Sequence, residues 1–492
     1  MDFDLRQVQE FGKKGWYNKH YSGLPITLSS IAKGIATPLE DVGWSMRFSA
    51  WFFRENMFNF YWGQEDMERV RQYVLEHNDA NSKFAVEIIQ RWERQAKKVH
   101  EKVQKLERRP LETLSDEQFI HETSQLNEMH AVASYLPHIA DSFLETGETS
   151  WAHAALEKDL TGVPPTERGT TIEALCRPTE LTFVRQEYAE LVDVARKRED
   201  GSQEEFEAAL EAHAHKWQWI ENNYRKGSHL NTAYFQDKLN RLTTKELAGG
   251  TEVERKRLHR VKEKKAEILE RNGKRAQNLI FLLERFGVWQ DARKKMNLHA
   301  TQAWFRIRDE LVRRTALSED EANYLCGDEV EKALNGTIEK ETLAGRKTHG
   351  LALMGLSEKL LKWTGNEMRR AESLFETVET ETDEIKGVIA SKGFAKGRAV
   401  LLLNLHAMAR VKQGDVIVSN QTTPEYVPAL KKAAAIVTDQ GGLTCHAAII
   451  SRELGIPAVI GTRIASRVFH EGDVLEVDAV HGVVRRIRNP TN

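Results

Sequence analysis

The chain has 492 residues, of which 40% are hydrophobic and 29% are charged, so it is long enough for two or three domains that each have a core. Its mean hydropathy is negative and it contains no long apolar run, which excludes a membrane-spanning helix. The formal net charge of -2 argues against a surface dedicated to nucleic acid or to anionic membranes.

The cysteines and the N-terminus bear on metal binding and on the cell compartment of the protein. Cys176, Cys326 and Cys445 have no metal-type spacing and are too few for a disulfide framework, so we expect no metal site. The N-terminus, MDFDLRQVQEF, is acidic and lacks the basic and apolar blocks of a signal peptide. We therefore expect a cytoplasmic protein.

The first 75 residues are rich in aromatic side chains. Such a cluster could line an aromatic substrate pocket, but we favour a packing surface, because aromatic side chains bury large areas whatever the function. The residues are Trp16, Tyr17, Tyr21, Trp44, Phe48, Trp51, Phe52, Phe53, Phe58, Phe60, Tyr61 and Trp62.

Helical periodicity dominates residues 1–376. Apolar residues recur at helical spacing over 84–106, and strand-like alternation is scarce. Ser115 with Gln118 and Ser318 with Glu321 are capping-box pairs ahead of apolar-periodic segments, which predicts helix starts there. We therefore predict a mainly α-helical region of one or two subdomains, whose substrate-binding residues the sequence does not identify.

Two polar segments in this region could carry function. In 213–219, His213 and Trp217 share one helix face, whereas two histidines at i and i+2 point about 200 degrees apart and make no metal pair. The basic run 252–275 could bind a polyanion, but interspersed glutamates favour a solvated helix. We predict helix packing for the first segment and a solvent-exposed face for the second.

A change of composition marks the domain boundary. Residues 377–386 are acidic and have little apolar content, so we predict a hinge linker there, between the helical region 1–376 and a C-terminal domain 387–488. In that domain, the apolar run 433–437 predicts a buried strand. Gly441 and Gly442 permit a tight turn, Thr444 stands at a predicted helix N-cap, and His446 then falls in the first turn of a helix that ends at Gly455.

A histidine in a first helical turn is suited to phosphoryl chemistry. Free N–H groups and the helix dipole stabilise a dianion there. Neutral imidazole is a competent nucleophile near pH 7, and a covalent intermediate would split phosphoryl transfer into two easier steps. A lone histidine after a glycine turn would more often cap or pack the helix; here the surrounding segment favours chemistry.

That segment, GGLTCHAAIISRELGIPAVIGT at 441–462, resembles the phosphohistidine, or swivelling, domain of the phosphoenolpyruvate (PEP)-utilising enzymes, such as PEP synthase, pyruvate phosphate dikinase and rifampin phosphotransferase. Supporting motifs extend over about 100 residues: GVIASKG from Gly387, GRAV from Gly397, GDVIV from Gly414, TTPE from Thr422 and EGDVLEVD from Glu471. The resemblance implies an α/β swivelling fold in which His446 accepts the phosphoryl group, with Thr444, Gly441 and Gly442 positioning it.

The remainder of the chain limits what this resemblance implies. Residues 1–376 do not have the strand-rich pattern of an ATP-grasp domain, no P-loop occurs, and little sequence follows residue 488. The domain order is analogous to rifampin phosphotransferase without its ATP-grasp part. We therefore expect a cytoplasmic phosphotransferase that binds no cofactor itself. It would take a phosphoryl group from a separate ATP-grasp partner using Mg-ATP, or from PEP, and pass it to a small-molecule acceptor.

Two other classes of function stay open at this point. The chain could be a non-catalytic phosphocarrier or regulatory binding protein of a PEP synthase-like system, or it could retain the swivelling fold only as an interaction module. Only the last predicts that loss of His446 is tolerated.

Overall fold

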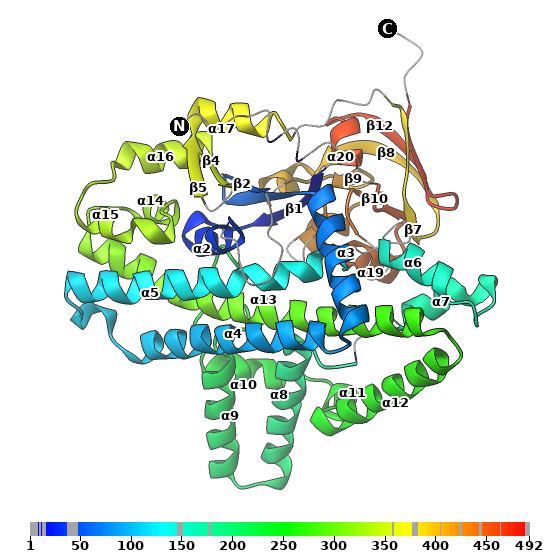
Figure 1. Cartoon of the computed structure of the whole chain (residues 1–492), viewed down its shortest axis with the longest axis horizontal. Coiled ribbons are helices and arrows are strands. Elements are labelled where there is room, and N and C mark those ends of the chain that lie inside the picture. The colour runs from blue at the N-terminus through cyan, green and yellow to red at the C-terminus, as the bar shows by residue number, and fades with distance from the viewer. Residues whose placement is uncertain are drawn as a thin grey trace. The chain divides into compact units, whose positions relative to one another are not determined.

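The computed structural model describes residues 8, 11, 16–36, 48–144, 151–175, 179–356, 359–375, 382–403, 405–422, 426–441, 445–462 and 464–487 (Figure 1). The chain divides into two compact units. The first, the helical unit, comprises residues 1–144 and 156–375; the second, the C-terminal unit, comprises residues 376–492 together with 145–155. The protein is multidomain and its N-terminal region is mainly helical, as predicted.

Three long helices form the framework of the helical unit: α4 (Phe84–Arg108), α5 (Asp116–Tyr135) and α13 (Lys274–Arg314), with α4 packed against both of the others (Figure 1). The predicted spacing on α4 is confirmed, because Ile88, Trp92, Val99, Val103 and Leu106 are buried. These residues form an apolar strip along one face of α4. The strip buries apolar area on every turn, and this burial, more than helix propensity, stabilises the helix.

Smaller helices surround this framework. A hairpin of α8 and α9 projects from it, with α10 between them (Figure 1). Both predicted capping boxes are present, at Ser115 with Gln118 before α5 and at Ser318 with Glu321 before α14. The bounds are α2 (Pro25–Ala36), α3 (Gln64–Ala80), η2 (Leu111–Thr113), η3 (Leu136–Ser142), α6 (Trp151–Asp159), α7 (Pro165–Leu175), α8 (Phe183–Asp200), α9 (Gln203–Trp217), α10 (Thr232–Asn240), α11 (Thr244–Leu247), α12 (Thr251–Glu270), α14 (Glu319–Asn323), η4 (Gly327–Glu329), α15 (Val330–Leu334), α16 (Lys340–His349) and α17 (Gly365–Glu372).

The helical unit also contains a five-stranded antiparallel sheet that the sequence pattern did not predict. Its order is β1-β3-β2-β4-β5, formed by β1 (Trp16–Ser22), β2 (Phe48–Arg54), β3 (Met57–Gly63), β4 (Leu351–Leu356) and β5 (Lys359–Thr364). The central strand β2 is buried along Phe48–Phe53, so it lacks the alternation by which a half-buried strand is recognised.

The N-terminal aromatic residues lie mostly on β1, β2 and β3 and form the core of this sheet. Phe48, Phe52 and Phe53 are at most 2% exposed, and Trp51 stacks on Phe58 and contacts Phe60 in a tilted arrangement. The packing interpretation is confirmed for these residues, although the elements are strands and not helices. Trp44 lies outside the described residues.

The C-terminal unit is built on an eight-stranded mixed sheet of order β6-β13-β12-β8-β9-β10-β11-β7. The strands β8 to β11 are parallel to one another, and the outer pairs are antiparallel. The bounds are β6 (Glu384–Lys386), β7 (Val388–Ser391), β8 (Phe394–Leu401), β9 (Val416–Ser419), β10 (Ala435–Thr438), β11 (Ala458–Ile460), β12 (Val474–Asp478) and β13 (Val483–Arg486), with η5 (Leu405–Arg410), α18 (Val427–Leu430), α19 (His446–Leu454) and α20 (Ala465–Val468).

Two apolar cores cover the two faces of this sheet. Ala447 and Ala448 of α19 pack with Ile417, Ile436 and Ile460 on one face. On the other face, α20 contributes Ala465 and Val468 to a core with Val418, Val437 and Leu475. Alternate residues of each central strand therefore enter opposite cores, which fixes the register of the strands and the position at which α19 begins.

The segment 377–386, predicted to be a hinge, is only partly described, because 376–381 lie outside the described residues. Its last three residues form β6, which pairs with β13. The prediction is therefore wrong for Glu384–Lys386: backbone pairing with β13 makes them an edge strand, and the burial of Ile385 anchors this strand in the core.

Candidate functional site

The candidate site lies where β10 gives way to α19. The chain leaves β10 at Thr438 and passes through Gly441, whose φ of +128 is a backbone conformation that favours glycine. Gly442 and Thr444 lie outside the described residues. The helix begins at His446, which therefore occupies its first turn; the description of His446 is limited to its backbone.

The N-cap of α19 is Cys445 and not Thr444, which corrects the sequence-based expectation. Cys445 has extended backbone angles, φ -70 and ψ 164, so it cannot be part of the helix, and the first helical residue is one position later than predicted. No side-chain cap hydrogen bond is formed at this end. An anion attached to the first turn would approach the N–H groups of that turn.

The C-terminal end of α19 lies where the sequence predicts it. Gly455 is the C-cap, with φ 65, and its N–H bonds the carbonyl groups of Ser451 and Arg452. The helical spacing of Ala447 and Leu454 predicts that both are buried; Ala447 is 2% exposed, but Leu454 is 36% exposed. Ser451 is buried in its place and donates its hydroxyl to the carbonyl of Ala448.

Asp439 holds the loop that leads into the site. Its carboxylate accepts hydrogen bonds from the Ser466 N–H (3.0 Å), the Ser466 hydroxyl and the Thr462 hydroxyl (3.3 Å). The Asp439 N–H also donates to the carbonyl of Ser419 at 3.0 Å, across the ends of two parallel strands. Burial raises the pKa of this carboxyl above its usual value. Asp439 is thus a positioning residue for the loop before His446.

No sequence motif marks the role of Asp439. Its partners Thr462 and Ser466 follow β11, more than 20 residues further along the chain. The signal that could have identified it is its place directly after a buried strand, because the carboxyl ends of parallel strands meet at one edge of a sheet.

The other sequence candidates lie in helix packing or on an exposed helix face. His213 is buried, with Nε2 3.3 Å from Glu187, and its ring meets Phe235 edge-on. Trp217 donates its indole N–H to Glu190. On α12, Arg255 is exposed and pairs with Glu252, as expected for a solvated helix.

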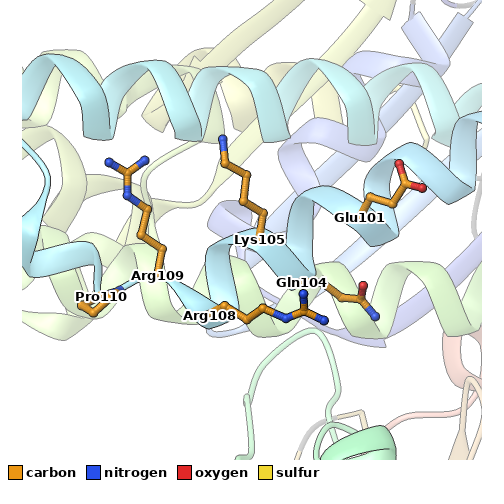
Figure 2. A pocket seen from close by; sticks show the side chains of 6 residues that line it. All are labelled: Glu101, Gln104, Lys105, Arg108, Arg109 and Pro110. Carbon is orange, nitrogen blue, oxygen red and sulfur yellow. The ribbon is translucent and has the colours of Figure 1, made fainter.

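A pocket of the helical unit lies at the C-terminal end of α4 (Figure 2). Lys105 and Arg109 extend toward α5, where they contact the carboxylate of Glu122 at 2.9 and 3.4 Å (Figure 2). Burial raises the pKa of Glu122, but hydrogen bonds from Lys102 and Lys105 outweigh the effect of burial and lower this pKa to about 2. The cations therefore fasten α4 to α5. The lining residues are Glu101, Gln104, Lys105, Arg108, Arg109 and Pro110.

The described residues contain neither a metal cluster nor a membrane-spanning helix. Within the described ranges, no group of three or more His, Cys, Asp or Glu side chains is arranged to hold a metal ion. No helix in the part of the chain that the structure describes is long and apolar enough to cross a membrane.

Comparison with known proteins identifies a family that the region containing α19 matches. Residues 411–482 match the family described as PEP-utilising enzyme, mobile domain. A probable phosphoenolpyruvate synthase of Archaeoglobus fulgidus is 51% identical over 100 residues, which are 20% of this chain and 13% of that protein. A second probable phosphoenolpyruvate synthase, of Pyrococcus abyssi, is 46% identical over 123 residues, 24% of this chain and 15% of that protein.

A further relative, the uncharacterized phosphotransferase YvkC of Bacillus subtilis, is 34% identical over 168 residues, 33% of this chain and 20% of that protein. The chain thus spans only 13–20% of the length of these curated relatives. The match supports the predicted resemblance for the C-terminal part of the chain. The C-terminal unit of this protein therefore contains a mobile domain of the PEP-utilising enzyme family.

Proposed function

We propose that this chain is the component of a phosphotransferase that carries a phosphoryl group on His446. The group comes from Mg-ATP through a separate ATP-grasp protein, or from PEP, and passes to a small-molecule acceptor held by the helical unit. One observation carries the proposal: within the matched region 411–482, His446 is the first residue of α19.

The local geometry supports a phosphoryl group at this position. The N–H groups of a first helical turn point out of the helix and carry the positive end of its dipole, which favours an anion by roughly 0.3–1 kcal/mol on an exposed surface. The Gly441 turn and the buried Asp439 fix the loop before the helix. Positioning and electrostatic stabilisation supply most of the catalysis in phosphoryl transfer.

The source of the phosphoryl group is inferred from the domain organisation. The matched relatives named PEP synthase are far longer than the region they share with this chain. A nucleotide site on a separate polypeptide would supply what the shared region does not. The transfer would then require the C-terminal unit to deliver His446 to two sites in turn.

Labelling of the protein tests this proposal. Purified protein is incubated with candidate ATP-grasp partners and ATP radiolabelled in its β or γ phosphate, or with labelled PEP, and acid-labile label is measured. We expect label on the wild type and none on His446→Ala. His470→Ala is the matched control, because His470 is an exposed histidine of the same unit and should keep full labelling. Equal labelling of wild type and His446→Ala would contradict the proposal.

The alternative is a non-catalytic phosphocarrier or regulatory binding protein, and it differs only in the second step. A chase of labelled protein with unlabelled small molecules separates the two. Release of label onto a small molecule, at a rate that depends on its concentration, supports the enzyme. Transfer only to a partner protein supports the carrier.

A further inference from the structure

A buried polar cluster joins β1, η3 and α13 within the helical unit. At its centre, the carboxylate of Asp141 accepts hydrogen bonds from Lys19 Nζ (2.9 Å), Arg293 (2.9 and 3.2 Å), His138 Nδ1 (2.8 Å) and Gln290 (3.2 Å). The Asp141 side chain is 1% exposed. Five donors converge on one carboxylate, so its position is fixed by segments that lie far apart in the sequence.

The charges of this cluster do not balance. Burial raises the pKa of Asp141, but the cations Arg293 and Lys19 outweigh burial and hold the pKa well below its usual value, so the group is ionised. Among the described residues, two cations therefore face one anion. The nearby phenols do not supply the missing negative charge, because burial raises the pKa of Tyr17 and Tyr224 and keeps both neutral. A buried positive charge without a counter-ion is costly.

His138 adds an unused hydrogen-bond acceptor. Its Nδ1 lies 2.8 Å from the Asp141 carboxylate and so carries the proton, which places the lone pair on Nε2. The Nε2 atom is buried and has no hydrogen-bond partner in the part of the chain that the structure describes, and the side chain is only 9% exposed. Burial lowers the pKa of His138 to about 4, so the ring is neutral near pH 7 and can accept a hydrogen bond.

A second cluster in the same unit shows what a purely structural arrangement looks like. There the buried Glu187 accepts hydrogen bonds from Lys238 at 2.7 and 2.8 Å and lies 3.3 Å from His213 Nε2. One cation faces one anion, and no atom of this trio is among the buried polar atoms without a partner in the described residues. The Asp141 cluster differs by one extra positive charge and one orphaned acceptor.

The two cations of the Asp141 cluster are partly exposed, whereas Asp141 and His138 Nε2 are buried. The side chains of Lys19 and Arg293 are 19% and 12% exposed, and Tyr17 and Tyr21 beside them are half-buried. An ammonium group has three N–H donors, so Lys19 retains a donor after bonding Asp141 and the neighbouring Tyr17 hydroxyl. A ligand can therefore reach the cations without unfolding the sheet.

We propose that this cluster is the acceptor site of the helical unit, and that it binds a small molecule with an anionic group and a hydroxyl group. Lys19 and Arg293 bind the anionic group, and the hydroxyl donates to His138 Nε2. The assignment of this ligand as the phosphoryl acceptor rests on the proposed function. In the transfer, the hydroxyl oxygen bonds to phosphorus and its proton moves to His138 Nε2. The P–N bond to His446 breaks, and the imidazole of His446 keeps the electron pair.

Binding of two probes by the full-length protein tests the site. Calorimetric titrations at fixed ionic strength compare glycolate, which has both groups, with acetate, which lacks the hydroxyl. We expect saturable binding of both, with glycolate tighter. Lys19→Met should weaken both probes about tenfold or more, which corresponds to about 1.4 kcal/mol, and Lys19→Arg should restore binding. His138→Asn keeps a donor toward Asp141 but lacks Nε2, so it should remove the preference for glycolate.

The matched controls are Lys238→Met and His213→Asn in the balanced cluster, which should bind both probes as the wild type does. Absence of saturable binding to the wild type, or unchanged binding by Lys19→Met, would overturn the site. Labelling of His446 is measured on the same variants. If His446 fails to label while glycolate binds as expected, the proposed function fails and the site stands. If His446 labels and glycolate does not bind, the site fails and the proposed phosphorylation of His446 stands.

Discussion

Gly461 lies so close to Gly441 that a Cβ on Gly461 would stand 3.0 Å from the carbonyl oxygen of Gly441. Both residues have positive φ, and each follows a strand of the parallel part of the C-terminal sheet, β11 and β10. The turn that leads to His446 is thus packed against the exit of the neighbouring strand. Its shape depends on two residues without side chains.

Gly441→Ala should therefore destabilise the C-terminal unit and reduce labelling of His446. The added Cβ would stand 2.6 Å from Sγ of Cys445, in a backbone conformation that costs of order 1–3 kcal/mol for other residues. Gly472→Ala is the control, because Gly472 also has positive φ but nothing lies within 4 Å of its Cβ position. Urea unfolding and labelling of both variants check this. A smaller loss for Gly441→Ala than for Gly472→Ala would contradict the packing argument.

Two helix glycines of the helical unit should respond to alanine in opposite directions. A Cβ on Gly34 of α2 would overlap the carbonyl oxygen of Ala131 on α5, so Gly34→Ala should cost about 1–3 kcal/mol through overpacking. Nothing lies within 4 Å of the Cβ position of Gly287 on α13, so Gly287→Ala should stabilise the helix by roughly 0.5–1 kcal/mol. Urea unfolding measures both; a stabilised Gly34→Ala would show that α2 and α5 do not meet as described.

The helical unit should lose stability as the pH falls from about 6.5 to about 4. Burial lowers the pKa of His130 and His138 to about 4, so the unfolded chain binds more protons than the folded chain over this range. Each histidine would contribute a loss on the order of 3 kcal/mol. Asp141 stays ionised throughout this range and does not oppose the trend.

Tryptophan fluorescence reports mainly on this unit, because ten of the 11 tryptophans belong to it and Trp151 belongs to the C-terminal unit. Urea midpoints near pH 7 and near pH 4.5 are compared for the wild type, for His138→Asn and for His259→Gln, whose ring is exposed on α12. We expect His138→Asn to reduce the pH dependence and His259→Gln to leave it unchanged. Equal pH dependence in all three proteins would show that His138 does not titrate as described.

Local sequence rules were sufficient to predict features that depend on a few consecutive residues. The capping boxes at Ser115 and Ser318 and the C-cap at Gly455 each depend on bonds within five residues, and all were predicted. The start of α19 was displaced by one residue, because the choice between Thr444 and Cys445 depends on backbone angles that the sequence leaves undetermined.

Features assembled from distant segments were not predicted. The strand β2 pairs with β4 about 300 residues later, and burial on both faces removes the alternation that would have marked it as a strand. The Asp141 cluster unites β1, η3 and α13, and none of its residues belongs to a recognisable motif. Unbalanced charge and an orphaned acceptor are visible only when these segments are brought together.

The pairing of β2 with β4 also governs when this protein can fold during its synthesis. A nascent chain exposes the apolar β2 from residue 48 onward, but the ribosome delivers its partner strand only at residues 351–356. Throughout that interval the unpaired edge of β2 is a template for association with other chains. Chaperone binding to the early part of the nascent chain would protect this edge until β4 arrives.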